Sequence, residues 1–127
     1  MTSGGGRHNK LLGSRGEDLA VSFLEGLRYR ILERNFRCKA GEVDIVAQDG
    51  KTLVFVEVKT RRTAWYGPPQ LAVTSFKQRQ ISKAALTWLA ARRRHDSNAR
   101  FDVVAITFKP DAEPDIEHFV NAFDLRF

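Results

Sequence analysis

Three residues that lie close together in the sequence have side chains suited to phosphodiester hydrolysis: Asp44, Glu57 and Lys59. Two carboxylates can share one divalent cation, and oxygen ligands on a rigid sheet suit Mg²⁺ or Mn²⁺ better than zinc. Such an ion lowers the pKa of a bound water and neutralises charge on a phosphate oxygen. Lys59 can orient that water or stabilise the transition state as a fixed positive charge. These residue types indicate metal-dependent hydrolysis with water as the nucleophile.

The spacing serves this chemistry only if a hairpin holds the side chains on one face of a sheet. Asp49-Gly50 between two apolar runs is a strong signal for a two-residue turn. With that turn Glu42 faces Glu57, Asp44 lies diagonally from Glu57, and Lys59 shares their face. A three-residue loop instead puts Asp44 and Glu57 on opposite faces. The two-residue turn is therefore the prediction on which the site depends.

The elements around this hairpin predict an α/β fold, a restriction-endonuclease-like mixed sheet flanked by helices in the order α-β-β-β-α-β-β. Helices are expected at 14–26 and 75–94, strands at 29–37, 42–48, 51–59, 101–108 and 116–122, and a loop at 60–72. Residues 1–12 contain three consecutive glycines and no apolar run, which predicts a flexible tail before a single domain at 13–127.

Both predicted helices begin with a serine and a partner three residues later, the spacing of a capping box. The pairs are Ser14 with Glu17 and Ser75 with Gln78. Glu17 has a second interpretation, because it also lies on the helix side that faces the sheet and can then join the metal ligands. The two interpretations stay open at this point.

Positive charge is concentrated in the middle of the chain. The net charge is +6, and residues 59–100 hold ten lysines and arginines against one acid. A basic segment between neutral and acidic parts suits a polyanion bound on one face, and the alternative is a solvated surface with incidental asymmetry. The candidate nucleic-acid-binding residues are Arg61, Arg62, Lys77, Arg79 and Lys83.

Composition excludes several other classes of protein. The single cysteine, Cys38, rules out an internal disulfide and every multi-cysteine zinc pattern, so a reducing cytoplasm is expected. The apolar runs are too short for a membrane span, which predicts no membrane partner. His8, His95 and His118 lack ligand spacing and are expected on the surface.

Two segments carry a resemblance to known proteins. The segment 41–46 (GEVDIV) followed by 53–61 (LVFVEVKTR) resembles the PD-(D/E)xK nuclease superfamily. From Gly13 onward the chain is similar to the YraN-like family of uncharacterised bacterial proteins, for which endonuclease activity has been suggested. The layout also resembles archaeal Holliday-junction resolvases, which place a helical glutamate before the same residues. The resemblance implies the active-site set Glu17, Asp44, Glu57 and Lys59.

Some assignments keep two readings. Glu42 either supports the metal-binding side chains or caps the turn at Gly41, and Gln78 is a further candidate for such support. Glu57 and Lys59 can be an ordinary surface pair on an edge strand. Asp102 either supports the site or ends its strand.

The leading hypothesis is an endonuclease that uses Mg²⁺ or Mn²⁺ to hydrolyse phosphodiester bonds in DNA, at branched or damaged structures. One site cuts one strand, so symmetric cleavage of a junction would require a homodimer. A non-catalytic nucleic-acid-binding module that keeps the nuclease fold is the alternative, and it needs no divalent ion. A protein-interaction subunit is a third hypothesis.

Overall fold

The computed structural model describes residues 2–62 and 73–126, with side chains described from residue 13 onward. Its elements are α1 (Thr2–Gly26), β1 (Arg30–Cys38), β2 (Gly41–Asp49), β3 (Thr52–Arg61), α2 (Ser75–Ala91), β4 (Ala99–Thr107) and β5 (Asp115–Phe123). This order and the mixed α/β class confirm the predicted fold. The predicted loop at 60–72 lies largely outside the described residues, and its first two residues belong to β3.

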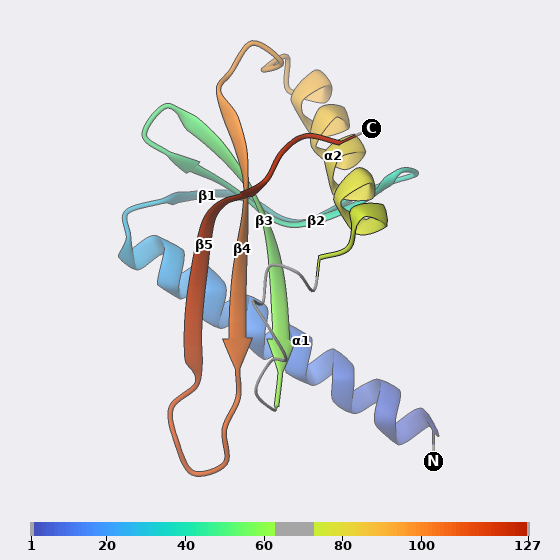
Figure 1. Ribbon diagram of the computed structural model, residues 1–127, viewed down its shortest axis with the longest axis vertical. Helices are drawn as coiled ribbons and strands as arrows, with labels where there is room; N and C mark the ends of the chain where they lie inside the picture. Colours follow the sequence, from blue (N-terminus) through green and yellow to red (C-terminus); the bar gives the residue numbers. More distant parts are fainter. Residues whose placement is uncertain (1, 63–72, 127) are drawn as a thin grey trace.

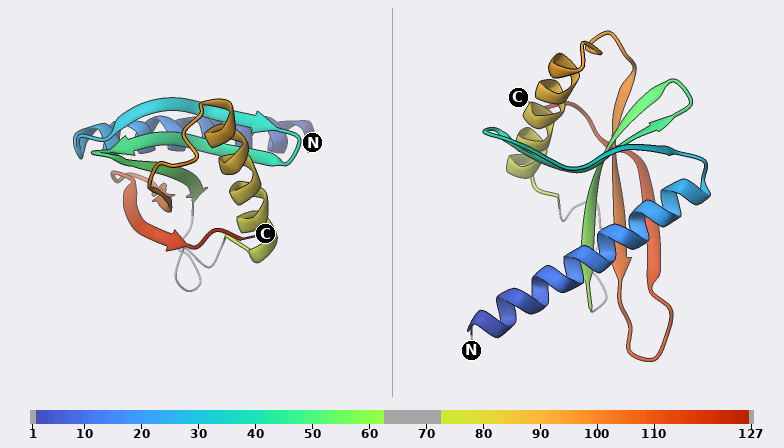
Figure 2. Two further views of the ribbon diagram at one scale, coloured as in Figure 1. Left: turned by 90° about the horizontal axis from the view of Figure 1, so that it is seen from above. Right: turned by 180° about the vertical axis from the view of Figure 1, so that it is seen from behind.

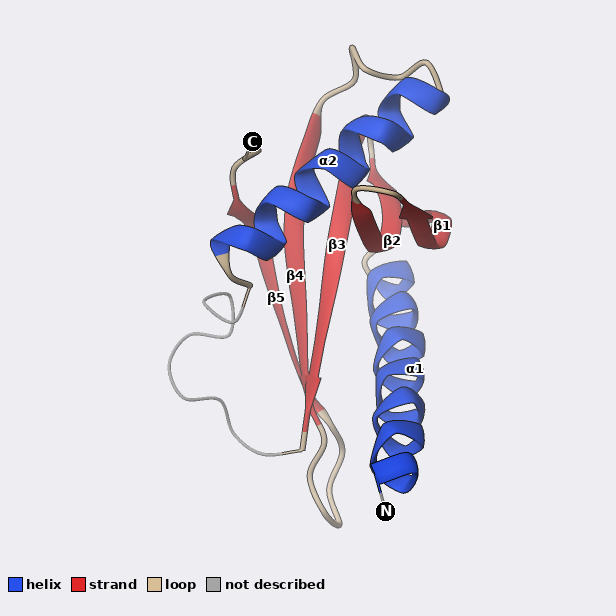
Figure 3. Cartoon of the chain, turned by 90° about the vertical axis from the view of Figure 1, so that its right-hand side faces the viewer, coloured by secondary structure: helices blue, strands red, loops and turns tan. Residues whose placement is uncertain are grey.

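The strands form one sheet in the order β1-β2-β3-β4-β5 (Figure 1). β3 and β4 are parallel and the other neighbours are antiparallel. A parallel pair needs a long crossover connection, and α2 lies in it. Figure 3 shows α1 and α2 on opposite sides of the sheet, and in the view from behind in Figure 2 α1 crosses in front of the strands.

Each helix covers its own core. On one face the α2 residues Ile81, Ala84 and Trp88 pack with Phe55 and other strand residues. On the other face the α1 residues Ala20 and Leu24 pack with strand residues Ile45, Val54, Val56, Val104 and Ile106. Odd-numbered Leu53 and Phe55 thus face α2 while even-numbered neighbours face α1, as strand alternation requires. β3 pairs with β2 on one side and with β4 on the other, so the interpretation of Glu57 and Lys59 as a surface pair on an edge strand is wrong.

The hairpin turn is shifted by one residue from the prediction. Asp49 pairs with Thr52, so the turn residues are Gly50 and Lys51 rather than Asp49 and Gly50. Gly50 adopts a φ of 61°, which favours glycine. Asp49 stays in the strand, where its carboxylate forms an ion pair with Arg100 at 3.2 Å. The loop still has two residues, so every side chain keeps the predicted face of the sheet. The predicted pairing of Glu42 with Glu57 and the predicted diagonal placement of Asp44 are wrong, because the observed register continues to Asp44 opposite Glu57.

Both capping predictions are wrong in position. α1 begins at Thr2, twelve residues before the predicted start, so neither Ser14 nor Glu17 caps it. Whether residues 1–12 are flexible stays a prediction. α2 is capped by Thr74 rather than Ser75, because the Thr74 side chain accepts the Lys77 N–H. The helix ends at Ala91 rather than Arg94.

α1 lies tightly against the sheet at Gly16. A Cβ atom built on Gly16 would lie 1.9 Å from Cγ2 of Thr60, on β3. Such a distance cannot be accommodated unless Thr60 moves. The missing side chain therefore sets how closely α1 lies against the strand that carries Glu57 and Lys59.

Gly16→Ala should lower the free energy of unfolding by about 1–3 kcal/mol, the usual effect of overpacking. Thr60→Ala in the same chain should restore most of this loss, because it removes the clashing methyl group. Gly13→Ala, with open space around its Cβ, is the control and should stabilise the helix by about 0.5–1 kcal/mol. Urea denaturation of Gly16→Ala, Thr60→Ala, the double variant and Gly13→Ala measures the coupling between residues 16 and 60. Additive effects of Gly16→Ala and Thr60→Ala on the free energy of unfolding would contradict the contact.

Candidate functional site

Asp44 and Glu57 meet where strands β2 and β3 separate. The backbone pairing of the two strands ends at Ile45 and Val56, and Asp44 and Glu57 are the next residues along each strand. Oδ2 of Asp44 accepts the backbone N–H of Val58 at 2.8 Å. The carboxylate thus continues the contact between the strands after the backbone pairing has ended, and this bond fixes its position beside Glu57.

Glu57 is buried among apolar strand residues, with a side chain only 6% exposed. Burial and, after it, the negative charge of Asp44 raise the pKa of Glu57 to about 8, against the lowering effects of Lys77 and Lys59. Burial also raises the pKa of Asp44, against the effect of the Val58 N–H. The two carboxyl groups interact directly, so without a cation they are best satisfied by a shared proton.

Two lysines face the same oxygen of Glu57. Nζ of Lys59 lies 3.8 Å from Oε2, and Nζ of Lys77 lies 3.9 Å from it. Lys77 was predicted as a contact for nucleic-acid phosphates, and the structure places it beside the carboxylate pair. Its position follows from helix periodicity, because Lys77 stands one turn before Ile81 on the α2 stripe that faces the sheet.

Glu17 lies near the pair but is held by β1. Its Oε1 accepts hydrogen bonds from Arg34 at 3.0 and 3.1 Å and from Asn35 at 2.9 Å. Its negative charge is close enough to Asp44 to contribute to the raised pKa of that group, after burial. The structure therefore brings Glu17 to the edge of the site, with a partner of its own on β1.

Glu42 also lies at the edge of the site. Its Oε2 is 3.5 Å from Nε of Arg37, and its charge adds to the raised pKa of Asp44. A polar cavity of about 260 Å³ opens here between the β1–β2 turn and α2. Glu42 and Lys77 are among its lining residues, so the cavity leads from solvent toward the lysine that contacts Glu57.

The residues present fit a divalent cation in part. Within the described ranges, no group of three or more His, Cys, Asp and Glu side chains is arranged to hold a metal ion, so Glu17, Asp44 and Glu57 do not form a closed three-ligand set. Mg²⁺, however, is commonly held by one or two carboxylates, with waters and substrate phosphates completing its shell. Oε1 of Glu57 is buried without a hydrogen-bond partner among the described residues, as a ligand atom would be in the absence of its cation.

The other predicted nucleic-acid contacts are spread over several faces. Arg61 is the last residue of β3 and Arg62 follows it. Arg79 is half-buried on α2 and Lys83 is exposed, one turn further on, on a different side of the helix from Lys77. Gln78 contacts the carbonyl of Val73 and the side chain of Arg126, so its predicted supporting role does not appear among its contacts.

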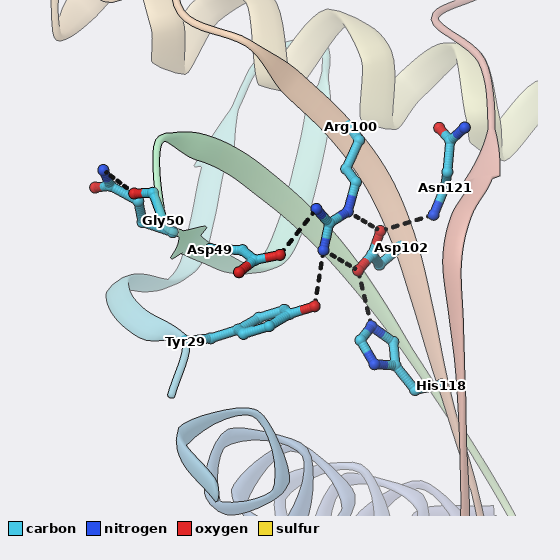
Figure 4. Close-up of polar contacts among 8 residues, drawn as sticks. Tyr29, Asp49, Gly50, Arg100, Asp102, His118 and Asn121 are labelled. Atoms are coloured by element: carbon cyan, nitrogen blue, oxygen red, sulfur yellow. Dashed lines mark hydrogen bonds and ion pairs between the residues drawn. The ribbon is translucent and has the colours of Figure 1, made fainter. Parts of the chain in front are cut away.

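A second charged cluster was not recognised from the sequence. Asp102 is fully buried in the middle of β4, so the interpretation that it ends the strand is wrong. It accepts hydrogen bonds from Arg100, the backbone N–H of Asn121 and Nε2 of His118 (Figure 4). His118 has a side chain 8% exposed, which corrects its predicted surface position. Strand alternation could have found both, because Asp102, Val104 and Ile106 share the α1 face.

Comparison with known proteins finds uncharacterised relatives. A family model described as "Uncharacterised protein family UPF0102" matches residues 16–106, which include all the candidate carboxylates. A UPF0102 protein of Geobacter sulfurreducens is 72% identical over 124 residues, covering 97% of this chain and 96% of that protein. One of Geotalea daltonii is 62% identical over 127 residues, the full length of both. One of Rhodococcus opacus is 51% identical over 116 residues, 91% and 98% of the two chains.

In the part of the chain that the structure describes, neither helix is long and apolar enough to cross a membrane.

Proposed function

This chain belongs to the UPF0102 family, whose description states no activity, and we propose from the site itself that it is a divalent-metal-dependent endonuclease acting on DNA. The observation that carries the proposal is the pair of half-buried Asp44 and buried Glu57, in which the pKa of both groups is raised and Oε1 of Glu57 has no hydrogen-bond partner among the described residues. Two like charges buried together are unfavourable, and a cation between them relieves that repulsion.

In this proposal Asp44 and Glu57 hold Mg²⁺ or Mn²⁺. The bound ion supplies a water of lowered pKa and neutralises charge on the phosphate. Lys59 and Lys77 lie on one side of Glu57, where either ammonium group can donate to a phosphate oxygen or to the attacking water. The Val58 N–H holds Asp44 in place, so the site needs little rearrangement when substrate arrives.

A second candidate function is a nucleic-acid-binding module without turnover. The observation that favours it is the contact of Glu17 with Arg34 and Asn35, which leaves two rather than three carboxylates for a metal. Such a module should bind DNA in a salt-sensitive way and should need no divalent ion. A protein-interaction role and a homodimer both stay predictions.

Cleavage of labelled duplex, flap, single-stranded and four-way-junction DNA with Mg²⁺, Mn²⁺ or EDTA tests the proposal. Wild-type protein should cut in either metal and not in EDTA. Lys59→Met should lower the cleavage rate about 100-fold or more, because it removes a donor to the transition state. Lys51→Met, in the exposed β2–β3 turn, is the matched control and should retain activity. Binding without metal-dependent cutting would support the module instead.

A further inference from the structure

A basic cavity of about 410 Å³ lies at the carboxyl ends of the parallel strands β3 and β4. Crevices at this end of parallel strands are common ligand sites in α/β sheets. Phe108, at the cavity, packs on the α1 side of the sheet, whereas Lys77 approaches Glu57 from α2. The cavity is therefore distinct from the carboxylate site. Its lining residues are Arg15, Arg62, Phe108, Lys109 and Pro110.

Three separate parts of the chain bring positive charge to this cavity. Arg15 comes from α1, Arg62 from the end of β3, and Lys109 from the segment after β4. Asp115 forms an ion pair with Lys109 and is the acid that faces this group from β5. The lining that these three side chains give the cavity is basic, which favours a phosphate group.

The side chain of Arg15 is stacked on an aromatic ring. Its guanidinium carbon lies 4.7 Å from the ring centroid of Phe108. Stacking occupies one face of the guanidinium plane, and the N–H donors at its edge remain directed outward in that plane. The other face is flat and exposed, a surface on which an unpaired base can stack.

We propose that this cavity binds one unpaired nucleotide of a nucleic-acid strand. The base stacks on the outer face of Arg15, and Arg62 and Lys109 contact the phosphate. Bases in a duplex are paired and stacked inside it and cannot reach such a surface. The stacked arginine therefore selects single-stranded nucleic acid. The identification of that nucleotide as part of the substrate rests on the proposed nuclease function; the binding site itself does not.

Binding in EDTA tests this inference without any cleavage. Fluorescence anisotropy with a labelled single-stranded oligonucleotide, a matched duplex and a free nucleoside monophosphate as competitor would compare wild type with Arg15→Gln and Lys109→Gln. Each variant should weaken single-strand binding about fivefold, with less effect on duplex, and Lys109→Gln should also reduce the salt dependence by about one phosphate contact. Lys51→Gln, with the same loss of charge at the other end of β3, should change neither.

Each outcome decides the matter. Equal affinities for Arg15→Gln and Lys51→Gln, equal effects of Arg15→Gln on single strand and duplex, or no binding by wild type would overturn the inference. Competition by the free nucleotide that depends on Arg15 would confirm the site and assign it to a soluble nucleotide. If DNA is never cut but single-strand binding depends on Arg15, the proposed nuclease fails while this site stands.

Discussion

Replacing Glu57 by glutamine should abolish metal-dependent cleavage and, in the metal-free protein, should raise the free energy of unfolding at pH 8 and above. The loss of activity, about 1,000-fold or more, follows from removing one of the two carboxylates that are proposed to hold the cation. The gain in stability follows from the raised pKa of Glu57. The residue would thus contribute to function at the expense of stability.

The sign of the stability effect follows from proton linkage. Burial and the charge of Asp44 raise the pKa of Glu57 from 4.5 to about 8, so the folded protein holds this proton while the unfolded chain has released it. Stability should fall as pH rises from about 4.5 through 8 and level off above that. At about 1.4 kcal/mol per pKa unit, the full penalty is at most about 5 kcal/mol. The Glu57→Gln variant should recover about 1–3 kcal/mol of this penalty. The recovery is partial because glutamine also loses the ion pairs with Lys59 and Lys77.

Thermal unfolding at pH 5 and pH 8.5, with EDTA or with Mg²⁺, measures both effects. Wild type in EDTA should lose more stability between these two pH values than Glu57→Gln does. Mg²⁺ should stabilise wild type at pH 8.5 and leave the variant unchanged, because metal binding replaces the proton. Glu25→Gln, exposed on α1, is the control and should behave as wild type. Identical pH dependence of the two variants would contradict the assignment.

Replacing Asp102 by alanine should lower the free energy of unfolding by about 3–5 kcal/mol, the usual effect of breaking a buried ion pair from one side. Asp102 is fully buried and receives hydrogen bonds from Arg100, His118 and Asn121. Without the carboxylate, Arg100 keeps its contacts with Asp49 and the hydroxyl of Tyr29. The melting temperature should fall by about 10–20 °C.

The effect of Asp102 should also depend on pH. Burial alone would raise the pKa of Asp102, but the hydrogen bonds from His118 and Arg100 hold it below its ordinary value. Its contribution is therefore present above about pH 4 and is lost as pH falls through the lowered pKa. Asp111→Asn, in the exposed segment before β5, is a matched control and should change the melting temperature little. A loss in Asp102→Ala no larger than in that control would contradict the role of the cluster.

The fold could be predicted because its signals are local. Alternation of apolar residues on β3, the two-residue turn and the stripe on α2 are each set by a few neighbouring residues. The turn was misplaced by one residue because Asp49 has a partner, Arg100, that lies far away in the sequence. The prediction that Asp44 and Glu57 share a face was still correct. A two-residue loop leaves the same side chains on the same face of the sheet even when the turn is shifted by one residue.

The site could be predicted only where one element supplies it. Asp44, Glu57 and Lys59 belong to a single hairpin, and their shared face follows from its register. Lys77 reaches the same carboxylate from a helix that follows ten undescribed residues, a placement that no local pattern contains. The contact of Glu17 with Arg34 likewise depends on where α1 crosses the sheet.

The parallel pairing of β3 with β4 also governs when the site is completed. Strands β1, β2 and β3 are neighbours in sequence, so they can form a meander early, whereas residue 53 pairs with residue 99. Contacts that close long loops form slowly. During synthesis the hairpin that carries Asp44 and Glu57 would emerge with the β4 side of β3 still open to water, and both carboxylates would be hydrated and charged. Arrival of β4 and α2 would bury them, so the newly made protein would acquire its affinity for a proton or a cation in the last step of folding.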